Sequence, residues 1–440
     1  MRAAERSAWW QPETLREAVA APSSESADGG EESAGGRVPF WALMAFTFVL
    51  LLAPQEFIPV LAPMRLGLLT AAVAITTHVA DRFTHRRPVM RVTRETVVAA
   101  GIAIWALVTL PWSYWPGGSL AFLLDMYFKT LAIFWLLGNV VNTRERLRLA
   151  AWGLALMAVP LAAFGVHEYH AGRFMDEGPV KRILSYEAPL TANPNDLALV
   201  LNLILPVTLA LALLQEATGL RLLLLGCAAL DAVAVILTFS RAGFICLALT
   251  GLIYVVKLIR RPERGWVVAA IVLTVACAPL LPSGYLERLR TITDIRSDPT
   301  GSAQERWGDT QAAIHLVSQS PIIGAGVGMN ILALNDMRGA LWKKVHNVYL
   351  EYAVDLGVPG LVLFLVIQAG CFRTAASVMR RTAGRSVWRD LFLLAEGIQV
   401  SLAVFAVAAL FHPVAYHFYF YYMAGLALAA RAACDAETQG

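Results

Sequence analysis

One arginine has a chemical type and a position that suggest binding of phosphate. Arg241 follows the apolar run that ends at Thr238-Phe-Ser. An arginine at the end of such a run is costly unless it reaches the membrane surface, pairs or faces a cavity. Its planar guanidinium group matches phosphate oxygens better than an ammonium group does. We expect Arg241 to face a lipid-borne phosphate; a structural alternative is that it only extends to the interface.

A histidine opens a later apolar run and could act as a general base. The segment reads His346-Asn347-Val-Tyr-Leu-Glu351. The dipole of a helix N-terminus disfavours the imidazolium ion, and a neutral imidazole is the form that accepts a proton. Asn347 and Glu351 share one helical face and could support the base. The alternative is an interfacial histidine with a structural role.

A third polar segment also precedes an apolar run. In Asn193-Pro194-Asn195-Asp196, the order of residues predicts a helix start, with Asn193 as the N-cap and Pro194 in the first turn. A helix start is sufficient to explain why these residues occur here. A sugar-binding role for Asn195 and Asp196 is a second possibility.

The sequence favours neither a metal nor another cofactor. The pairs His167/His170 and His412/His417 lack a convergent third ligand at a fixed spacing. No D-x-D motif is present, and none of the five cysteines forms a C-x-x-C pair. We therefore predict chemistry without a cofactor.

The composition indicates a protein that lies mostly in a membrane. Of the 440 residues, 58% are hydrophobic and only 15% are charged, whereas soluble proteins have roughly 25% charged residues. The mean hydropathy is +0.58. The net charge of +4 is too small to suggest binding to nucleic acid.

The apolar runs predict an all-α integral membrane protein with about twelve transmembrane helices. A helix needs about 20 apolar residues to cross a bilayer. The predicted spans are 38–54, 59–80, 95–112, 119–141, 147–166, 194–214, 220–239, 241–258, 265–282, 346–370, 388–410 and 413–432.

Arginine and lysine clusters predict the orientation of these spans. Four clusters fall on one side if the count is twelve, and short basic loops are cytoplasmic. The clusters lie at 82–94, 144–148, 257–264 and 373–389. Both termini would then be cytoplasmic. The predicted parts are a disordered tail (1–37), nine spans (38–282) with an outer segment (167–193), a large outer loop (283–345), three spans (346–432) and a short tail (433–440).

The outer loop 283–345 has its own predicted elements. Ser302-Ala-Gln-Glu305 matches a capping box, which predicts a helix from Ser302 to about Gln319, before Pro321. Its apolar stripe would contain Trp307, Ile314 and Val317, with Arg306 in the first turn. The run Gly324-Ala-Gly-Val-Gly328 predicts a tight turn or a close backbone approach.

Two motifs carry a resemblance to a known family. The segments LTFSRAGF (237–244) and SPIIGAGVGMN (320–330), the latter followed by HNVYLEYAVDLGVPGLVLF (346–364), resemble the O-antigen ligase and polymerase superfamily of bacterial envelope proteins. The resemblance implies a GT-C-like fold in the bacterial inner membrane with an active site on the periplasmic face.

The resemblance also implies a reaction and roles for three residues. A ligase of this family transfers a glycan from undecaprenyl pyrophosphate to a sugar hydroxyl of lipid A–core, without a metal and with inversion. By the same resemblance, Arg241 and the loop residue Arg306 would bind the pyrophosphate and His346 would be the base. Arg288, Arg290, Arg296 and Arg338 compete with Arg306 for the loop position.

Three alternatives remain open from the sequence. A polymerase would extend the glycan on its lipid carrier, and a protein O-oligosaccharyltransferase would use a protein hydroxyl. A transporter or flippase for the lipid-linked glycan is less favoured. The sequence shows no internal repeat, and a sixty-residue outer loop is unnecessary for transport.

Overall fold

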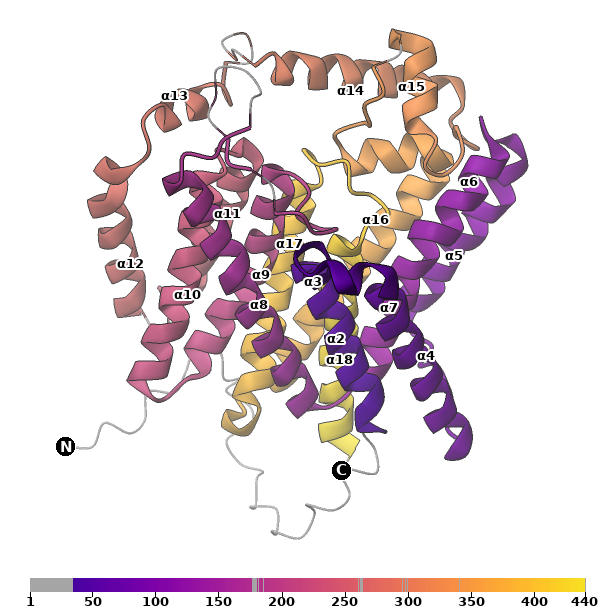
Figure 1. Cartoon of the computed structure of the whole chain (residues 1–440). Coiled ribbons are helices and arrows are strands. Elements are labelled where there is room, and N and C mark those ends of the chain that lie inside the picture. The colour runs from indigo at the N-terminus through magenta and orange to yellow at the C-terminus, as the bar shows by residue number, and fades with distance from the viewer. Residues whose placement is uncertain are drawn as a thin grey trace, which may run out of the picture.

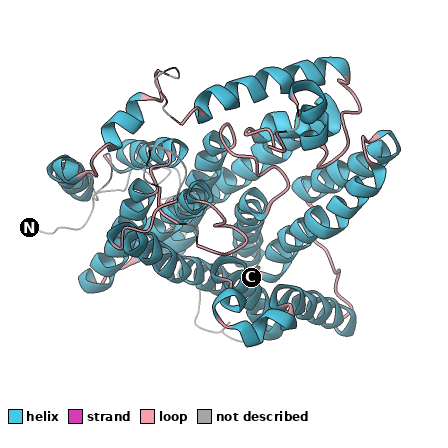
Figure 2. Ribbon diagram, turned by 45° about the horizontal axis from the view of Figure 1, so that its top comes forward, coloured by secondary structure: helices cyan, strands magenta, loops and turns pink. Residues whose placement is uncertain are grey.

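The chain folds into a helical bundle with helices laid across one end (Figure 1). The computed structural model describes residues 35–439 except 176–179, 181, 185, 260, 262–263, 295, 297, 299 and 340. Among these residues the only β-pairing is an isolated bridge between Phe174 and Ile183, and Figure 2 shows helices joined by loops. The predicted tail 1–37 lies almost entirely outside the described residues.

The main helices are α2 (Arg37–Leu52), α3 (Pro54–Phe57), α4 (Leu66–Thr84), α5 (Arg94–Thr109), α6 (Pro116–Phe122), α7 (Phe128–Val140), α8 (Arg144–His170), α9 (Pro194–Leu214), α10 (Thr218–Leu237), α11 (Arg241–Leu258), α12 (Arg264–Cys277), α13 (Tyr285–Arg290), α14 (Ser302–Gln319), α15 (Asn330–Arg338), α16 (Val348–Thr382), α17 (Arg389–Ala408) and α18 (Phe418–Gln439).

The prediction of an all-α membrane protein is confirmed. Within the described ranges, eight helical segments are long and apolar enough to cross a membrane. They are Arg94–Trp112, Pro116–Val140, Arg144–His170, Pro194–Leu214, Thr218–Leu237, Arg241–Leu258, Val348–Thr382 and Ser386–Ala408. Two shorter helical segments, Arg37–Leu52 and Arg264–Leu280, are also apolar. Every predicted span overlaps a helix, but the count of twelve spans remains our proposal.

Two predicted boundaries were wrong. Arg37 belongs to α2 and not to a disordered tail, and the segment 433–439 continues α18. In α18, Ala432, Ala433 and Cys434 are buried, so packing extends the helix beyond its apolar run.

Arginines from the predicted basic clusters meet at one end of the bundle. Arg146 donates to the carbonyls of Gly35 and Gly36 at 2.8 and 2.9 Å. Arg381 pairs with Asp435 near the end of α18, and Arg144 pairs with Asp390. The start of α2 and the end of α18 lie at this same end (Figure 1). The clusters at 144–148 and 373–389 thus share one end of the bundle, as the charge pattern predicts.

The segment 283–345 lies at the opposite end and contains α13, α14 and α15 (Figure 1). The predicted helix 302–319 is confirmed, but its capping box was wrong. Gly301 is the N-cap residue, with φ of 68°, and Glu305 instead pairs with Lys343 at 2.7 Å. Asp298 supplies the cap by accepting from the Ala303 amide at 3.0 Å.

The predicted apolar stripe of α14 was wrong at Trp307 and Ile314, whereas Val317 packs against the hydrophobic cluster as predicted. Trp307 and Ile314 are more than half exposed, whereas Asp309, Ala313 and Leu316 form the buried face. The helix packs against α16 and α15, which turns a face containing an acid inward. Ala313 and Leu316 join a hydrophobic cluster with residues of α15 and α16, and Asp309 pairs with Arg338.

The predicted glycine turn packs against a break in α16. The backbone leaves helical geometry at Gly357, where φ is 69° and ψ is −175°. Amides at this break and in the turn are satisfied across the contact: Gly326 donates to Asp355 O at 2.9 Å, and Val358 donates to Pro321 O at 2.7 Å. A Cβ on Gly324 would lie 2.6 Å from the Asp355 carbonyl, so only glycine fits the approach.

We predict that the segment 283–345 lies outside the cell membrane and that the loop after α16 lies inside. Single cysteines would be placed at the exposed positions Ser320 and Ser386 in a variant whose five native cysteines are replaced. An impermeant thiol reagent should label Ser320→Cys in intact spheroplasts and Ser386→Cys only after lysis. The reverse labelling would overturn the orientation.

Candidate active site

Arg241 begins α11 and is held by residues of the segment 283–345. Ser240 caps the helix by accepting from the Gly243 amide at 3.1 Å. The Arg241 guanidinium group then donates to Thr291 Oγ1 at 2.9 Å and to Ser302 Oγ at 3.0 Å. It also pairs with Asp298 Oδ2 at 3.0 Å, and its side chain is 12% exposed. Arg241 therefore makes specific contacts and does not simply extend to the interface.

Asp298 joins two arginines from different elements. Its Oδ1 pairs with Arg288 of α13 at 2.7 Å, while Oδ2 pairs with Arg241. Burial opposes ionisation of this carboxyl, but the hydrogen bonds from Thr300 and the charges of both arginines outweigh it and hold its pKa well below the ordinary value. Asp298 is therefore an ionised link between α11, α13 and the start of α14.

Arg306 lies one turn into α14. Within the described ranges, no ion pair joins its guanidinium group to an acid. Burial, with the charges of Arg241, Arg182 and Arg288, lowers its pKa to about 10. Three guanidinium groups thus act on Arg306, and among the described residues Asp298 is the carboxylate that acts against them. The surplus of positive charge favours a multiply charged anion.

His346 lies two residues before α16, so the prediction that it opens the helix was wrong. Asn347 is the N-cap. Burial and the charge of Arg306 lower the pKa of His346 to about 4. The imidazole is therefore neutral at physiological pH, as a base requires. Burial and the charge of Arg306 keep the imidazole neutral. The sequence had suggested the helix dipole as the cause of this neutral state.

The predicted supporting residues have structural partners. Asn347 Oδ1 accepts from the amides of Tyr349 and Leu350 at 3.0 and 3.1 Å. Glu351 is buried, and its Oε2 accepts from the Ala415 amide at 3.0 Å. These contacts set the start of α16 against the loop after α17.

The predicted start of α9 is confirmed. Asn193 Oδ1 accepts from the amides of Asn195 and Asp196 at 2.9 and 3.1 Å, and Asp196 accepts from the Asn193 side chain. The Asn195 carbonyl lies 3.4 Å from Nε2 of His412. Burial, together with the charges of Arg306 and His346, lowers the pKa of His412 to about 4. The start of α9 therefore borders the site.

Several residues of the site were missed from the sequence, and most of them belong to no motif. Asp298 and Arg182 belong to no recognisable pattern, and Arg288 was one of several competing arginines. Asp309 had a usable signal, because it follows Arg306 by three residues in a predicted helix, which places both side chains on one side.

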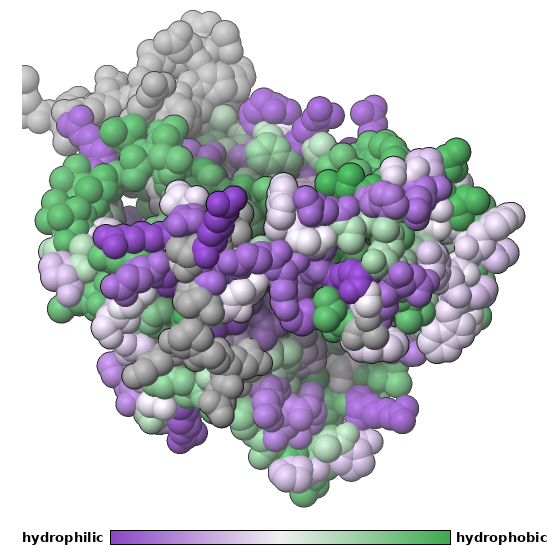
Figure 3. Space-filling model, turned by 90° about the horizontal axis from the view of Figure 1, so that it is seen from above, coloured by the Kyte–Doolittle hydropathy of each residue, from purple (hydrophilic) through white to green (hydrophobic). Residues whose placement is uncertain are grey.

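The face that carries α13 to α15 is hydrophilic across its middle (Figure 3), which suits a polar reaction at the membrane surface. No group of three or more His, Cys, Asp or Glu residues that could hold a metal lies within the described ranges.

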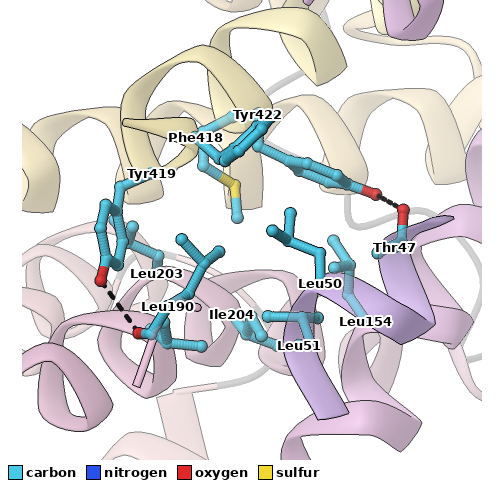
Figure 4. Close-up of a pocket in the computed structure, with 12 residues that line it drawn as sticks. Thr47, Leu50, Leu51, Leu154, Leu190, Leu203, Ile204, Phe418, Tyr419 and Tyr422 are labelled. Carbon is cyan, nitrogen blue, oxygen red and sulfur yellow. Dashed lines mark hydrogen bonds between the residues drawn. The ribbon is translucent and has the colours of Figure 1, made fainter. Parts of the chain in front are cut away.

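A separate cavity lies away from these residues, between α2, α8, α9 and α18 (Figure 4). Its volume is about 30 Å³, and leucines and aromatic rings line most of it. That volume has room for only one or two water molecules. It is too small for a sugar or a lipid chain and is not the site.

The fold and these residues define a multi-pass membrane protein with a cationic site and a neutral histidine at one membrane surface. Residues 226–365, about a third of the chain, match the family described as O-Antigen ligase. This match confirms the resemblance seen in the sequence. Members of that family are glycosyltransferase-type ligases and polymerases that act on lipid-linked glycans.

Other comparisons add less. No curated protein matches the sequence. A chain in the solved structure described as "Structural coordination of polymerization and crosslinking by a peptidoglycan synthase complex" is similar at 19% identity and a TM-score of 0.43. The alignment covers 78% of this chain and 97% of that one.

We predict that Asp298→Asn destabilises the protein by roughly 3–5 kcal/mol, the usual cost of leaving a buried charge without its partner. The measurement is thermal unfolding in detergent, with the exposed Glu287→Gln as the control. Because the native pKa of Asp298 is depressed, its stabilisation is complete above the ordinary carboxyl pKa of about 3.9 and is lost as the pH falls through the native value. Equal unfolding temperatures for the variant and the wild type at pH 7 would contradict the bridging role.

Proposed function

We propose that the protein is an O-antigen ligase that transfers a glycan from undecaprenyl pyrophosphate to a sugar hydroxyl of lipid A–core. The reaction would take place at the periplasmic face, with inversion at the anomeric carbon and without a metal. The observation that carries the proposal is that the charge of Arg306 acts together with Arg241 and on His346, three residues from separate parts of the sequence.

The arginines provide the chemistry for the leaving group. When the bond between the anomeric carbon and the pyrophosphate oxygen breaks, its electron pair leaves with undecaprenyl pyrophosphate. Arg306 has no ion pair with an acid in the described part of the chain and would face this charge, with Arg241 as the second cation. Charge-assisted hydrogen bonds from guanidinium groups stabilise such an anion.

His346 provides the chemistry for the acceptor. The acceptor oxygen forms the new bond to the anomeric carbon, and its proton passes to the imidazole. With a pKa of about 4, the free imidazole is ready but weakly basic. The bound pyrophosphate would offset the charge of Arg306, which is the second cause of the low pKa. Donor binding would therefore make the base stronger at the moment it is needed.

We predict that His346→Ala lowers transfer by roughly 10²–10⁴-fold, the scale of general acid–base catalysis, and leaves donor binding intact. The purified variant would receive undecaprenyl pyrophosphate-linked glycan and lipid A–core, with binding and transfer measured separately. Full transfer by the variant would remove His346 from the mechanism. Lost donor binding in a folded variant would instead make it a phosphate ligand.

We predict that Arg306→Ala weakens donor binding and slows transfer, and that Arg306→Lys recovers only part of both, because an ammonium group lacks the planar fork. The matched control is Arg290→Ala, an exposed arginine on α13, which should behave like the wild type. Wild-type donor binding by Arg306→Ala would move the pyrophosphate elsewhere. Transfer only to a second lipid-linked glycan, in the wild type, would identify a polymerase.

A further inference from the structure

The carboxylate of Asp309 lies between the imidazole of His346 and the guanidinium group of Arg338. Asp309 is on the buried face of α14 and is 4% exposed. Its Oδ1 pairs with Arg338 at the end of α15, and its Oδ2 lies 3.8 Å from Nδ1 of His346. One carboxylate thus faces a fixed guanidinium on one side and the imidazole on the other.

The Nδ1 atom of His346 is itself buried and has no hydrogen-bond partner among the described residues. A buried polar atom without a partner is costly, and Asp309 Oδ2 faces it. The separation is longer than a hydrogen bond, but catalytic contacts often tighten when substrate binds. A shift of about 1 Å would bring Oδ2 within the usual 2.7–3.2 Å range.

The other charges around His346 are positive. Arg306 of α14, Arg338 of α15 and Lys343 of the following loop all act against the imidazolium ion, and the buried His412 lies in the same field. Among the described residues, Asp309 is the acid whose carboxylate is within ion-pair distance of His346. A backbone hydrogen bond with Lys344 also favours the imidazolium ion, and Asp309 adds a negative charge 3.8 Å from Nδ1.

We propose that Asp309 is the positioning residue of the base: its carboxylate holds the Nδ1–H tautomer of His346, so that Nε2 takes the proton of the acceptor hydroxyl. The inference rests on the proposed function and deepens it. As the C–O bond to the acceptor forms, the proton moves to Nε2 and the imidazolium charge is balanced by Asp309. Arg338 pairs with the same carboxylate and holds it in place.

Steady-state kinetics of Asp309→Asn test the proposal. We expect kcat to fall about 10- to 100-fold, a share of the full general-base effect, with donor binding unchanged. Loss of the carboxylate also lowers the imidazole pKa, so the acidic limb of kcat/KM should move to lower pH. A wild-type kcat with an unmoved limb would overturn the role.

A double-variant cycle separates positioning from independent effects. Asp309→Asn/His346→Ala should be no slower than His346→Ala alone, because a positioning residue has nothing left to position. Multiplied losses would overturn the proposal. If His346→Ala itself transfers at the wild-type rate, the proposed base fails and this inference fails with it. Loss in His346→Ala with none in Asp309→Asn would overturn the inference alone.

Variants of Arg338 test whether Asp309 acts on His346 or serves only as the ion-pair partner of Arg338. Arg338→Met keeps the carboxylate but removes a cation near His346, so the acidic limb should move to higher pH, opposite to the shift in Asp309→Asn. The variant Asp309→Asn/Arg338→Met leaves no buried charge unpaired and guards against misfolding of the single variant. It should keep the loss of kcat. Recovery to the wild-type rate would reduce Asp309 to a partner of Arg338.

Discussion

The bridge from Arg241 through Asp298 to Arg288 is the interaction on which the site depends. It ties the first residue of a membrane-spanning helix to two elements of the segment that lies over the bundle. Asp298 also caps α14, the helix that presents Arg306 and Asp309. A single ionised carboxylate therefore fixes both the position of the helix and the direction in which its polar side chains point.

With this bridge formed, the site still has more positive than negative charge. Asp298 offsets part of the positive charge of Arg241 and Arg288, while Arg306 has no acidic contact in the described part of the chain. An unbalanced cation in a partly buried place is unfavourable on its own, and a bound pyrophosphate would relieve it. The low pKa of His346 is a consequence of this field as well as of burial, so the anion site and the base are electrostatically coupled.

The break in α16 gives the site its second fixed point. Non-helical backbone near a membrane must find partners inside the protein. Here Trp105 donates to the Leu356 carbonyl at 2.8 Å, and Asp355 accepts from the Gly328 amide at 2.9 Å. The glycine turn is held between α14 and α15, so these contacts align the outer helices with the start of α16, beside His346.

The sequence by itself determined the membrane class, the helices and the residue types of the site, because apolar runs and caps such as Asn193 act over a few neighbouring residues. It also placed Arg241, Arg306 and His346 next to the outer segment through their order along the chain. It did not find Asp298, misjudged the cap and the buried face of α14, and attributed the neutral state of His346 to a helix dipole. Those features were decided only by the tertiary structure. The ion pairs of Asp298 with Arg241 and Arg288, and the burial of His346 near the charge of Arg306, depend on contacts that the spacing of these residues in the sequence does not indicate.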